Sequence, residues 1–139
     1  MRHSATFLQE ILQRAIEAIK CGRFEHVYRR EYSTGQAVIW HFANNLSRLN
    51  ACCLSGSLYD EDDYMAVIRE CLENAEQSPG GTYKRPENNI CTHQEALELE
   101  MFAFVVTHED FSLPIYTKFC LKEQINGTWY VCIDCHPST

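Results

Sequence analysis

Residues 99–106 read LEMFAFVV, and their hydrophobic side chains alternate with the period of two that is typical of a β-strand. One alternating set contains Leu99 and Met101, and the other contains Phe102 and Phe104. A strand that is apolar on both faces usually lies inside a sheet, with covered faces on both sides. We therefore predict a strand over residues 99–106 that lies centrally in a β-sheet.

Two further strands are predicted after this one. A turn is expected at residues 108–110, and a second strand at 115–124, directly after Pro114. The dipeptide Asn126-Gly127 is a strong signal for a tight hairpin, and residues 128–134 would then form the third strand. The C-terminal third of the chain is thus predicted to be an antiparallel meander of at least three strands.

The chain before the meander has the helical period of 3.6 residues. The first helix is predicted to start after Ser4, which can cap it, and to stop at Gly22. A second strong helix is predicted to start at Asp60 and to end before the sequence Ser78-Pro79-Gly80-Gly81. Residues 78–91 are expected to be irregular. The apolar faces of the two helices consist of Leu8, Ile11, Leu12, Ala15, Ile16 and Ile19, and of Tyr64, Val67, Ile68, Cys71, Leu72 and Ala75.

The stretch between these helices allows two interpretations. Residues 23–42 fit either a helix or a hairpin. Residues 36–54 fit either one helix or a strand over 37–42 followed by a shorter helix, because this part is rich in residues that favour strands. Farther along, residues 92–95 could form a capping box over a short helical turn.

These patterns predict one α+β domain over residues 1–139. A chain of 139 residues has the size of a single domain. We expect three or four N-terminal helices packed on one face of a C-terminal antiparallel β-meander of at least three strands.

The N-terminal residues contain no apolar run of the length that a secretory signal needs, and we therefore expect a cytoplasmic protein. No stretch reaches the roughly 20 apolar residues that span a bilayer, so we also expect no membrane association. The chain has eight cysteines. In the reducing cytosol these are expected to be mostly free thiols that pack as small hydrophobic residues.

Charge is unevenly distributed along the chain. Residues 1–59 contain seven Lys or Arg and four Asp or Glu, a net charge of +3, whereas residues 60–139 contain five and fifteen, a net charge of −10. We therefore predict a non-enzymatic module that binds a basic protein, as an immunity protein or antitoxin binds a nuclease, with no cofactor and no nucleic acid partner. The residues predicted to contact the partner are Asp60, Glu61, Asp62, Asp63, Glu109 and Asp110.

A metal-independent RNase is the first alternative. Such an enzyme needs an acid, a base and a cation for the phosphate, and a cluster in the basic part of the chain could supply them: His26, Arg29, Arg30 and His41. His108, Glu109 and His136 near the predicted strand ends are further candidates. The overall acidic balance disfavours this alternative, because RNA binding depends mainly on neutralising phosphates.

A structural zinc site is the second alternative. Cys91 and His93 precede the first strand of the meander, and Cys132 and Cys135 form a C-x-x-C pair in its last strand. Together they could offer four ligands to a tetrahedral ion. The pair lacks the Gly or Pro that usually turns backbone amides toward the sulfurs, so no metal is included in the leading prediction.

Overall fold

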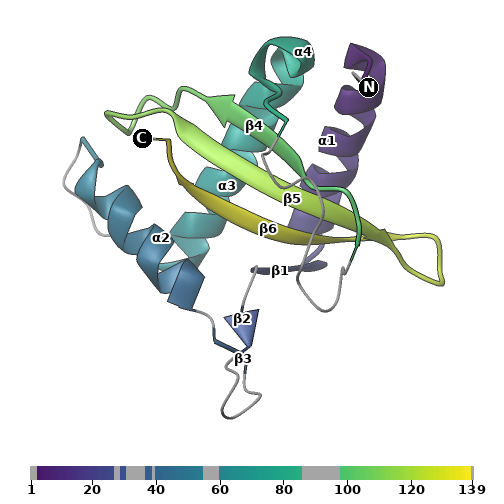
Figure 1. The fold of residues 1–139 in the computed structure, drawn as a ribbon, viewed down its shortest axis with the longest axis horizontal. Helices are drawn as coiled ribbons and strands as arrows, with labels where there is room; N and C mark the ends of the chain where they lie inside the picture. The colour runs from purple at the N-terminus through teal and green to yellow at the C-terminus, as the bar shows by residue number, and fades with distance from the viewer. Residues whose placement is uncertain are drawn as a thin grey trace.

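The structure, a computed structural model, describes residues 3–26, 29–30, 37–38, 40–54, 60–85 and 98–138; at 29–30, 37–38 and 40–43 it describes the backbone alone. Within these residues the elements follow in the order α1 (Ala5–Lys20), β1 (Phe24–His26), β2 (Arg29–Arg30), β3 (Ala37–Val38), α2 (Trp40–Ala51), α3 (Glu61–Gln77), α4 (Pro79–Thr82), β4 (Phe102–Val106), β5 (Ile115–Glu123) and β6 (Trp129–Pro137) (Figure 1). The predicted α+β class is confirmed.

The main sheet has four strands in the order β1-β6-β5-β4. The strands β4, β5 and β6 pair antiparallel, which confirms the predicted meander. The strand β1 pairs parallel to β6, with Phe24 opposite Val131. The prediction of a purely antiparallel sheet is therefore wrong, and the sheet is mixed. A three-residue strand has too short a pattern to reveal its partner or its direction.

The strand β4 lies at the edge of this sheet, so the predicted central position is wrong as well. Its free edge is partly covered, because Tyr83 forms an isolated bridge with Phe104 and the Lys84 amide donates to the carbonyl of Ala103 at 2.8 Å. The hydrophobic character on both sides of β4 reflects two different clusters. Phe102 and Phe104 join the main core, and Met101, just before the strand, joins a smaller cluster on the other face.

The described backbone of residues 23–42 contains a hairpin, but the strand considered over 37–42 is shorter than expected and covers only Ala37–Val38. Arg29 and Arg30 pair antiparallel with Val38 and Ala37 in a separate two-stranded ladder. The helix α2 begins only at Trp40, after this short strand. The possible capping box at 92–95 lies outside the described residues.

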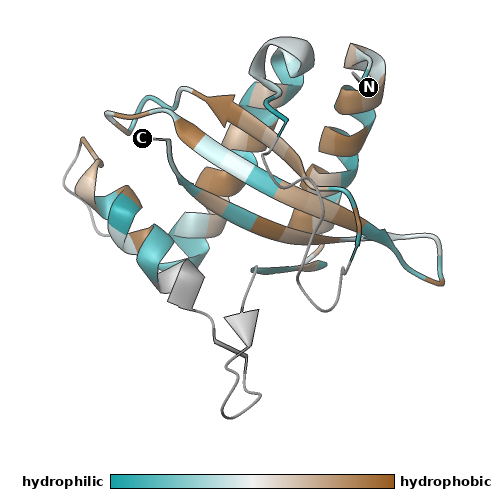
Figure 2. Ribbon diagram, viewed as in Figure 1, coloured by the Kyte–Doolittle hydropathy of each residue, from teal (hydrophilic) through white to brown (hydrophobic). Residues whose placement is uncertain are grey.

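The helices α1 and α3 pack against each other and against one face of the sheet, which we call the inner face; the opposite face is the outer face (Figure 1). The predicted apolar faces of both helices are buried there. Figure 2 shows this separation, with hydrophobic residues where α1 and α3 meet the strands and mostly hydrophilic residues along α2. Inner-face residues of the sheet include Phe102, Phe104, Ile115, Phe119, Val131 and Ile133.

The ends of the helices follow the expected chemistry. The Ser4 hydroxyl accepts the amide of Phe7, and Asp60 and Asp63 form a reciprocal capping box at the start of α3. The helix α3 ends at Gln77, as predicted, but Pro79 then starts the one-turn helix α4 inside the stretch expected to be irregular. Proline favours this first helical position because its missing N–H would have no helical partner.

A buried tyrosine side chain satisfies backbone hydrogen-bonding groups of β6 where no neighbouring strand of the described residues pairs with them. Because β1 pairs only with residues 131–133, the next backbone groups of β6 need another partner. The Tyr64 hydroxyl of α3 donates to the Cys135 carbonyl at 2.8 Å and accepts the Cys135 amide at 3.2 Å. Tyr64 is 1% exposed, so this hydroxyl links α3 to the sheet inside the core.

In the part of the chain that the structure describes, no helix is both long and apolar enough to cross a bilayer.

Candidate functional site: an acidic cleft

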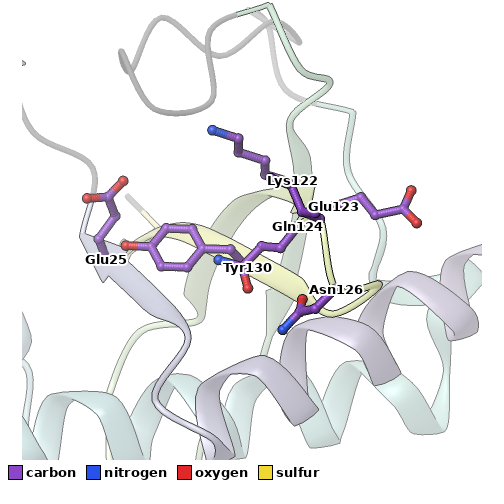
Figure 3. Close-up of a pocket in the computed structure, with 7 residues that line it drawn as sticks. Glu25, Lys122, Glu123, Gln124, Asn126 and Tyr130 are labelled. Carbon is purple, nitrogen blue, oxygen red and sulfur yellow. The ribbon is translucent and has the colours of Figure 1, made fainter.

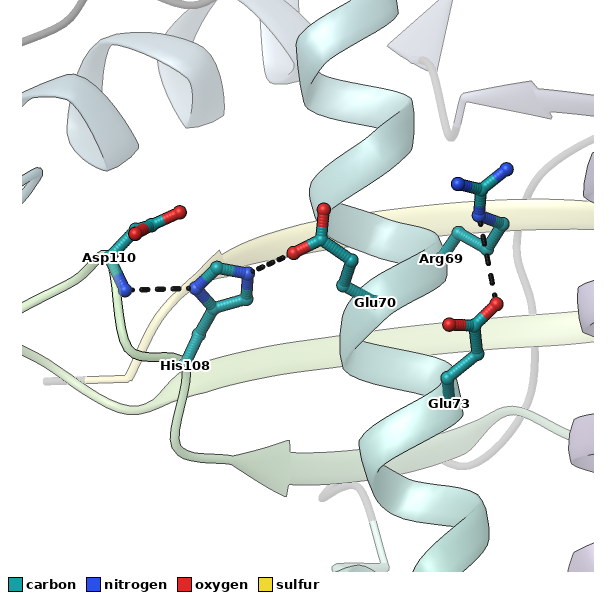
Figure 4. Close-up of polar contacts among 5 residues, drawn as sticks. All are labelled: Arg69, Glu70, Glu73, His108 and Asp110. Atoms are coloured by element: carbon teal, nitrogen blue, oxygen red, sulfur yellow. Dashed lines mark hydrogen bonds and ion pairs between the residues drawn. The ribbon is translucent and has the colours of Figure 1, made fainter.

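A small cleft of about 340 Å³ lies between α3 and the turn that follows β4. We call it the acidic cleft, and Figure 4 shows the polar contacts around it. Three of its six lining residues carry a carboxylate. The lining consists of Glu70, Glu73, Asn74, Thr107, His108 and Glu109.

His108 connects the two walls of this cleft. Its side chain is 3% exposed. The Asp110 amide donates to Nδ1 at 3.1 Å, so Nδ1 carries no proton, and Nε2 carries the proton and donates it to Glu70 Oε2 at 2.7 Å (Figure 4). The imidazole is therefore neutral in this arrangement. With both ring nitrogens engaged, His108 suits a positioning role better than proton transfer to a substrate.

The turn is also attached to the residues that directly follow α2. The Leu54 amide donates to the Asp110 carbonyl at 2.8 Å, and the Ser112 amide donates to the Cys52 carbonyl at 2.9 Å. The His108 ring contacts Phe111 edge-on, at 5.1 Å between ring centroids. These contacts hold the turn between α2 and α3, so its acidic side chains start from a fixed backbone.

The cleft keeps its negative charge. Arg69 pairs with Glu73 at 3.7 Å, and both side chains are almost half exposed. The exposed carboxylates of Glu109 and Asp110 have no ion pair within the described residues. Because the neutral His108 adds no positive charge, the acidic groups of the cleft outnumber the single arginine beside it.

The predicted partner-binding residues fall into two groups. Glu109 lines the acidic cleft and Asp110 follows it in the same turn. Residues 60–63 lie at the start of α3, about 12 Å along the helix axis from Glu70 at 1.5 Å per residue. In that second group Asp60 and Asp63 cap the helix.

Glu61 lies 3.5 Å from His26, and Asp62 is exposed like the other three residues of this group. Glu70 and Glu73 were not predicted. Their signal was the spacing of three residues, which puts both on one exposed side of α3.

Of the four residues considered for an RNase, only His26 has a described side chain. The His26 side chain is 11% exposed and packs against Tyr64, with 5.5 Å between ring centroids. Burial lowers the pKa of His26, and the Glu61 carboxylate opposes this shift. Such a position does not suit a group that must reach an RNA phosphate. Arg29 and Arg30 lie in β2 and His41 in α2, and their side chains fall outside the described part.

The cysteine pair considered for zinc is divided between the two faces of the sheet. Cys135 belongs to the main core, and Cys132 belongs to the small cluster on the outer face. Side chains three residues apart in a strand point in opposite directions, which explains the separation. Cys91 and His93 lie outside the described residues. Among the residues that are described, no group of three or more His, Cys, Asp or Glu side chains is arranged to hold a metal.

Neither models of protein families, nor curated proteins, nor solved structures match this chain.

Proposed function

We propose that this protein is an interaction module that binds a basic protein partner through the acidic cleft. The observation that carries the proposal is the hydrogen-bonded framework from which the cleft's carboxylates extend. Glu70 is held by His108, and Glu109 starts from a turn that is hydrogen-bonded to the residues directly after α2. Charges that are already in place cost less to order on binding.

The cleft suits one long basic side chain of the partner. Its volume of about 340 Å³ is small, and Glu73 and Glu109 contribute carboxylates from two different elements. A guanidinium group presents several donors in one plane and forms strong, charge-assisted hydrogen bonds with carboxylates. We therefore expect an arginine of the partner at this position.

A nuclease neutralised by an immunity protein or antitoxin is the kind of partner that this surface suits. Nucleases carry positive charge where they bind phosphates, and an acidic protein can cover that surface. A cytoplasmic location is part of the proposal. It is supported by the cysteines, because none of the seven in the described residues forms a disulfide.

The test is affinity capture from extract of the native host at low salt. The bait is the full chain, compared with Glu109→Gln/Asp110→Asn and with Glu10→Gln/Glu17→Gln. Both variants remove two exposed negative charges, but the second pair lies on α1. We expect a basic protein that wild type and the α1 variant retain and the turn variant loses.

The salt dependence of association completes the test. For the captured protein, the association rate with wild type should fall as ionic strength rises. Equal retention by all three baits, or an association rate that is independent of salt, would contradict the proposal. Recovery of RNA with cleavage activity would instead favour the RNase alternative.

A further inference from the structure

Four side chains that can each bind a metal ion or accept a proton from a thiol form one row across the main sheet. The strand register places Glu25 of β1 opposite Cys132 of β6, and Cys132 opposite Cys120 of β5. Phe102 of β4 is opposite Phe119, so Met101, one residue earlier, adjoins Cys120. The row thus contains a carboxylate, two thiols and a thioether, in that order, on the outer face.

The three sulfur-containing residues of this row form their own buried cluster. Met101 is 4% exposed, Cys120 0% and Cys132 1%, and the cluster is separate from the main core. The Cys132 thiol donates to Glu25 Oε1 at 3.4 Å. Directly opposed residues of antiparallel strands have Cα atoms about 4.5–5.5 Å apart, which allows two cysteine side chains to reach the same small ion.

These ligands fit a soft ion with a low coordination number. Zinc needs three or four nitrogen, sulfur or oxygen ligands from the protein, and the described residues provide no such group. Thiolate and thioether sulfurs prefer Cu(I), for which two thiolates are enough. We propose that Cys120 and Cys132 bind one cuprous ion on the outer face of the sheet, with the Met101 thioether beside it.

Binding exchanges protons for the metal. Two S–H bonds are replaced by two Cu–S bonds, and two protons are released for each ion bound. Both protons pass to the solvent, and Glu25 Oε1 is the atom to which the Cys132 thiol already donates. The bis-thiolate complex carries one negative charge, and Lys118 and Lys122 flank Cys120 two residues away on the same face of β5.

A pocket offers an approach to this site. It has a volume of about 830 Å³ and lies beside the β5–β6 hairpin, with Glu25, Lys122 and Tyr130 in its lining. Figure 3 shows the Tyr130 ring extending toward Glu25, with Lys122 above them. Glu25 therefore connects the pocket to the Cys132 thiol, and Tyr130 packs against the sulfur cluster. This proposal is independent of the acidic cleft.

The test is an anaerobic titration of the reduced full chain with Cu(I), in competition with the chromophoric chelator bicinchoninate. We expect one tight equivalent in wild type, and loss of that equivalent in Cys120→Ser and in Cys132→Ser. The controls Cys71→Ser, in the main core, and Cys21→Ser, on the surface, should keep it. Glu25→Gln should bind about tenfold more weakly, as is typical for the loss of a group that supports a metal ligand.

A second measurement needs no substitution, since a serine at a buried position can prevent folding. Amide NMR spectra of labelled wild type with one equivalent of Cu(I) should shift most at residues 101, 120 and 132. X-ray absorption of the same sample should show copper bound by sulfur. The proposal is overturned if the largest shifts occur around Cys21 and Cys53, if wild type holds no tight equivalent, or if the Cys71→Ser control loses it.

Discussion

The two faces of the sheet each bury a pair of cysteines, in different surroundings. On the inner face, Cys71 of α3 hydrogen-bonds with Cys135 of β6, and the Thr117 hydroxyl donates to the Cys135 sulfur at 3.5 Å. On the outer face, Cys132 lies opposite Cys120 and donates to the Glu25 carboxylate. Burial alone therefore does not define the chemistry of a thiol in this protein.

The difference lies in what each environment does with the proton. The hydrogen bond with Cys135 and then burial raise the pKa of the Cys71 thiol well above its ordinary value, so this side chain stays a neutral packing residue. The outer pair adjoins an acceptor that reaches a pocket. We infer that the inner face supplies stability, and that the outer face and the acidic cleft are the regions where binding chemistry can occur.

The largest expected effect comes from removing a large inner-face side chain. Phe119 is fully buried and packs against Phe102 and Phe104 at centroid distances of 5.9 and 6.0 Å. Phe119→Ala should lower the free energy of unfolding by about 3–5 kcal/mol, measured by urea denaturation. Lys122→Ala, an exposed outer-face control on the same strand, should change it by less than about 0.5 kcal/mol. Similar decreases in the free energy of unfolding of both variants would contradict the inference that the inner face supplies the stability.

A smaller effect is expected at the link between α3 and the edge of β6. Tyr64→Phe keeps the ring but leaves the buried carbonyl and amide of Cys135 without this hydroxyl. We expect a loss of about 1–3 kcal/mol in the free energy of unfolding. Tyr116→Phe, on the outer face, is the matched control and should have little effect. An unchanged Tyr64→Phe variant would mean that another donor or acceptor satisfies the strand edge.

Strong periodicity explains which parts of this fold could be predicted. The helices around Leu12 and Ile68 each bury one side, and the period of 3.6 records this directly. The hairpin at Asn126-Gly127 was also predictable, since Gly127 has a positive φ of 82° that the turn requires.

Non-local contacts explain what the sequence did not reveal. The partner of β1 lies more than a hundred residues away, because Phe24 pairs with Val131. The acidic cleft depends on His108 bringing its turn to Glu70, a contact between elements that no local spacing indicates. The row that links Glu25 to Cys132 depends on the same parallel pairing, so neither the cleft nor the row was predicted as a site.

The free energy of unfolding should depend on pH because of His26, which is buried on the inner face. The pKa of His26 lies below its ordinary value of 6.5 because burial disfavours the charged ring. At pH values above 6.5 the His26 ring is neutral in both the folded and the unfolded chain, so protonation of His26 does not lower the free energy of unfolding there. As the pH falls below 6.5, the unfolded chain takes up the proton first, so stability decreases until the folded-state pKa is reached.

The variant His26→Gln removes this titration. Between pH 7 and pH 5 its unfolding free energy should fall less steeply than that of wild type, by up to about 1.4 kcal/mol per pH unit. Urea denaturation at a series of pH values measures both slopes. His136→Gln, at an outer-face position, is the control and should leave the wild-type slope largely intact. A variant slope equal to that of wild type would assign the acid sensitivity to other groups.

The smallest effect on stability is expected at Arg69, together with faster association of a basic partner. Its ion pair with Glu73 joins two side chains that are 45% and 44% exposed, so Arg69→Gln should change the free energy of unfolding by less than about 0.5 kcal/mol. The same substitution removes the positive charge beside the acidic cleft. A basic partner should therefore associate faster with this variant than with wild type. The difference between the two association rates should be larger at low salt. Lys20→Gln, at the end of α1, makes the same charge change away from the cleft and should increase the rate less. Slower association of Arg69→Gln would show that the partner presents carboxylates to Arg69, which reverses the proposed polarity of the interface.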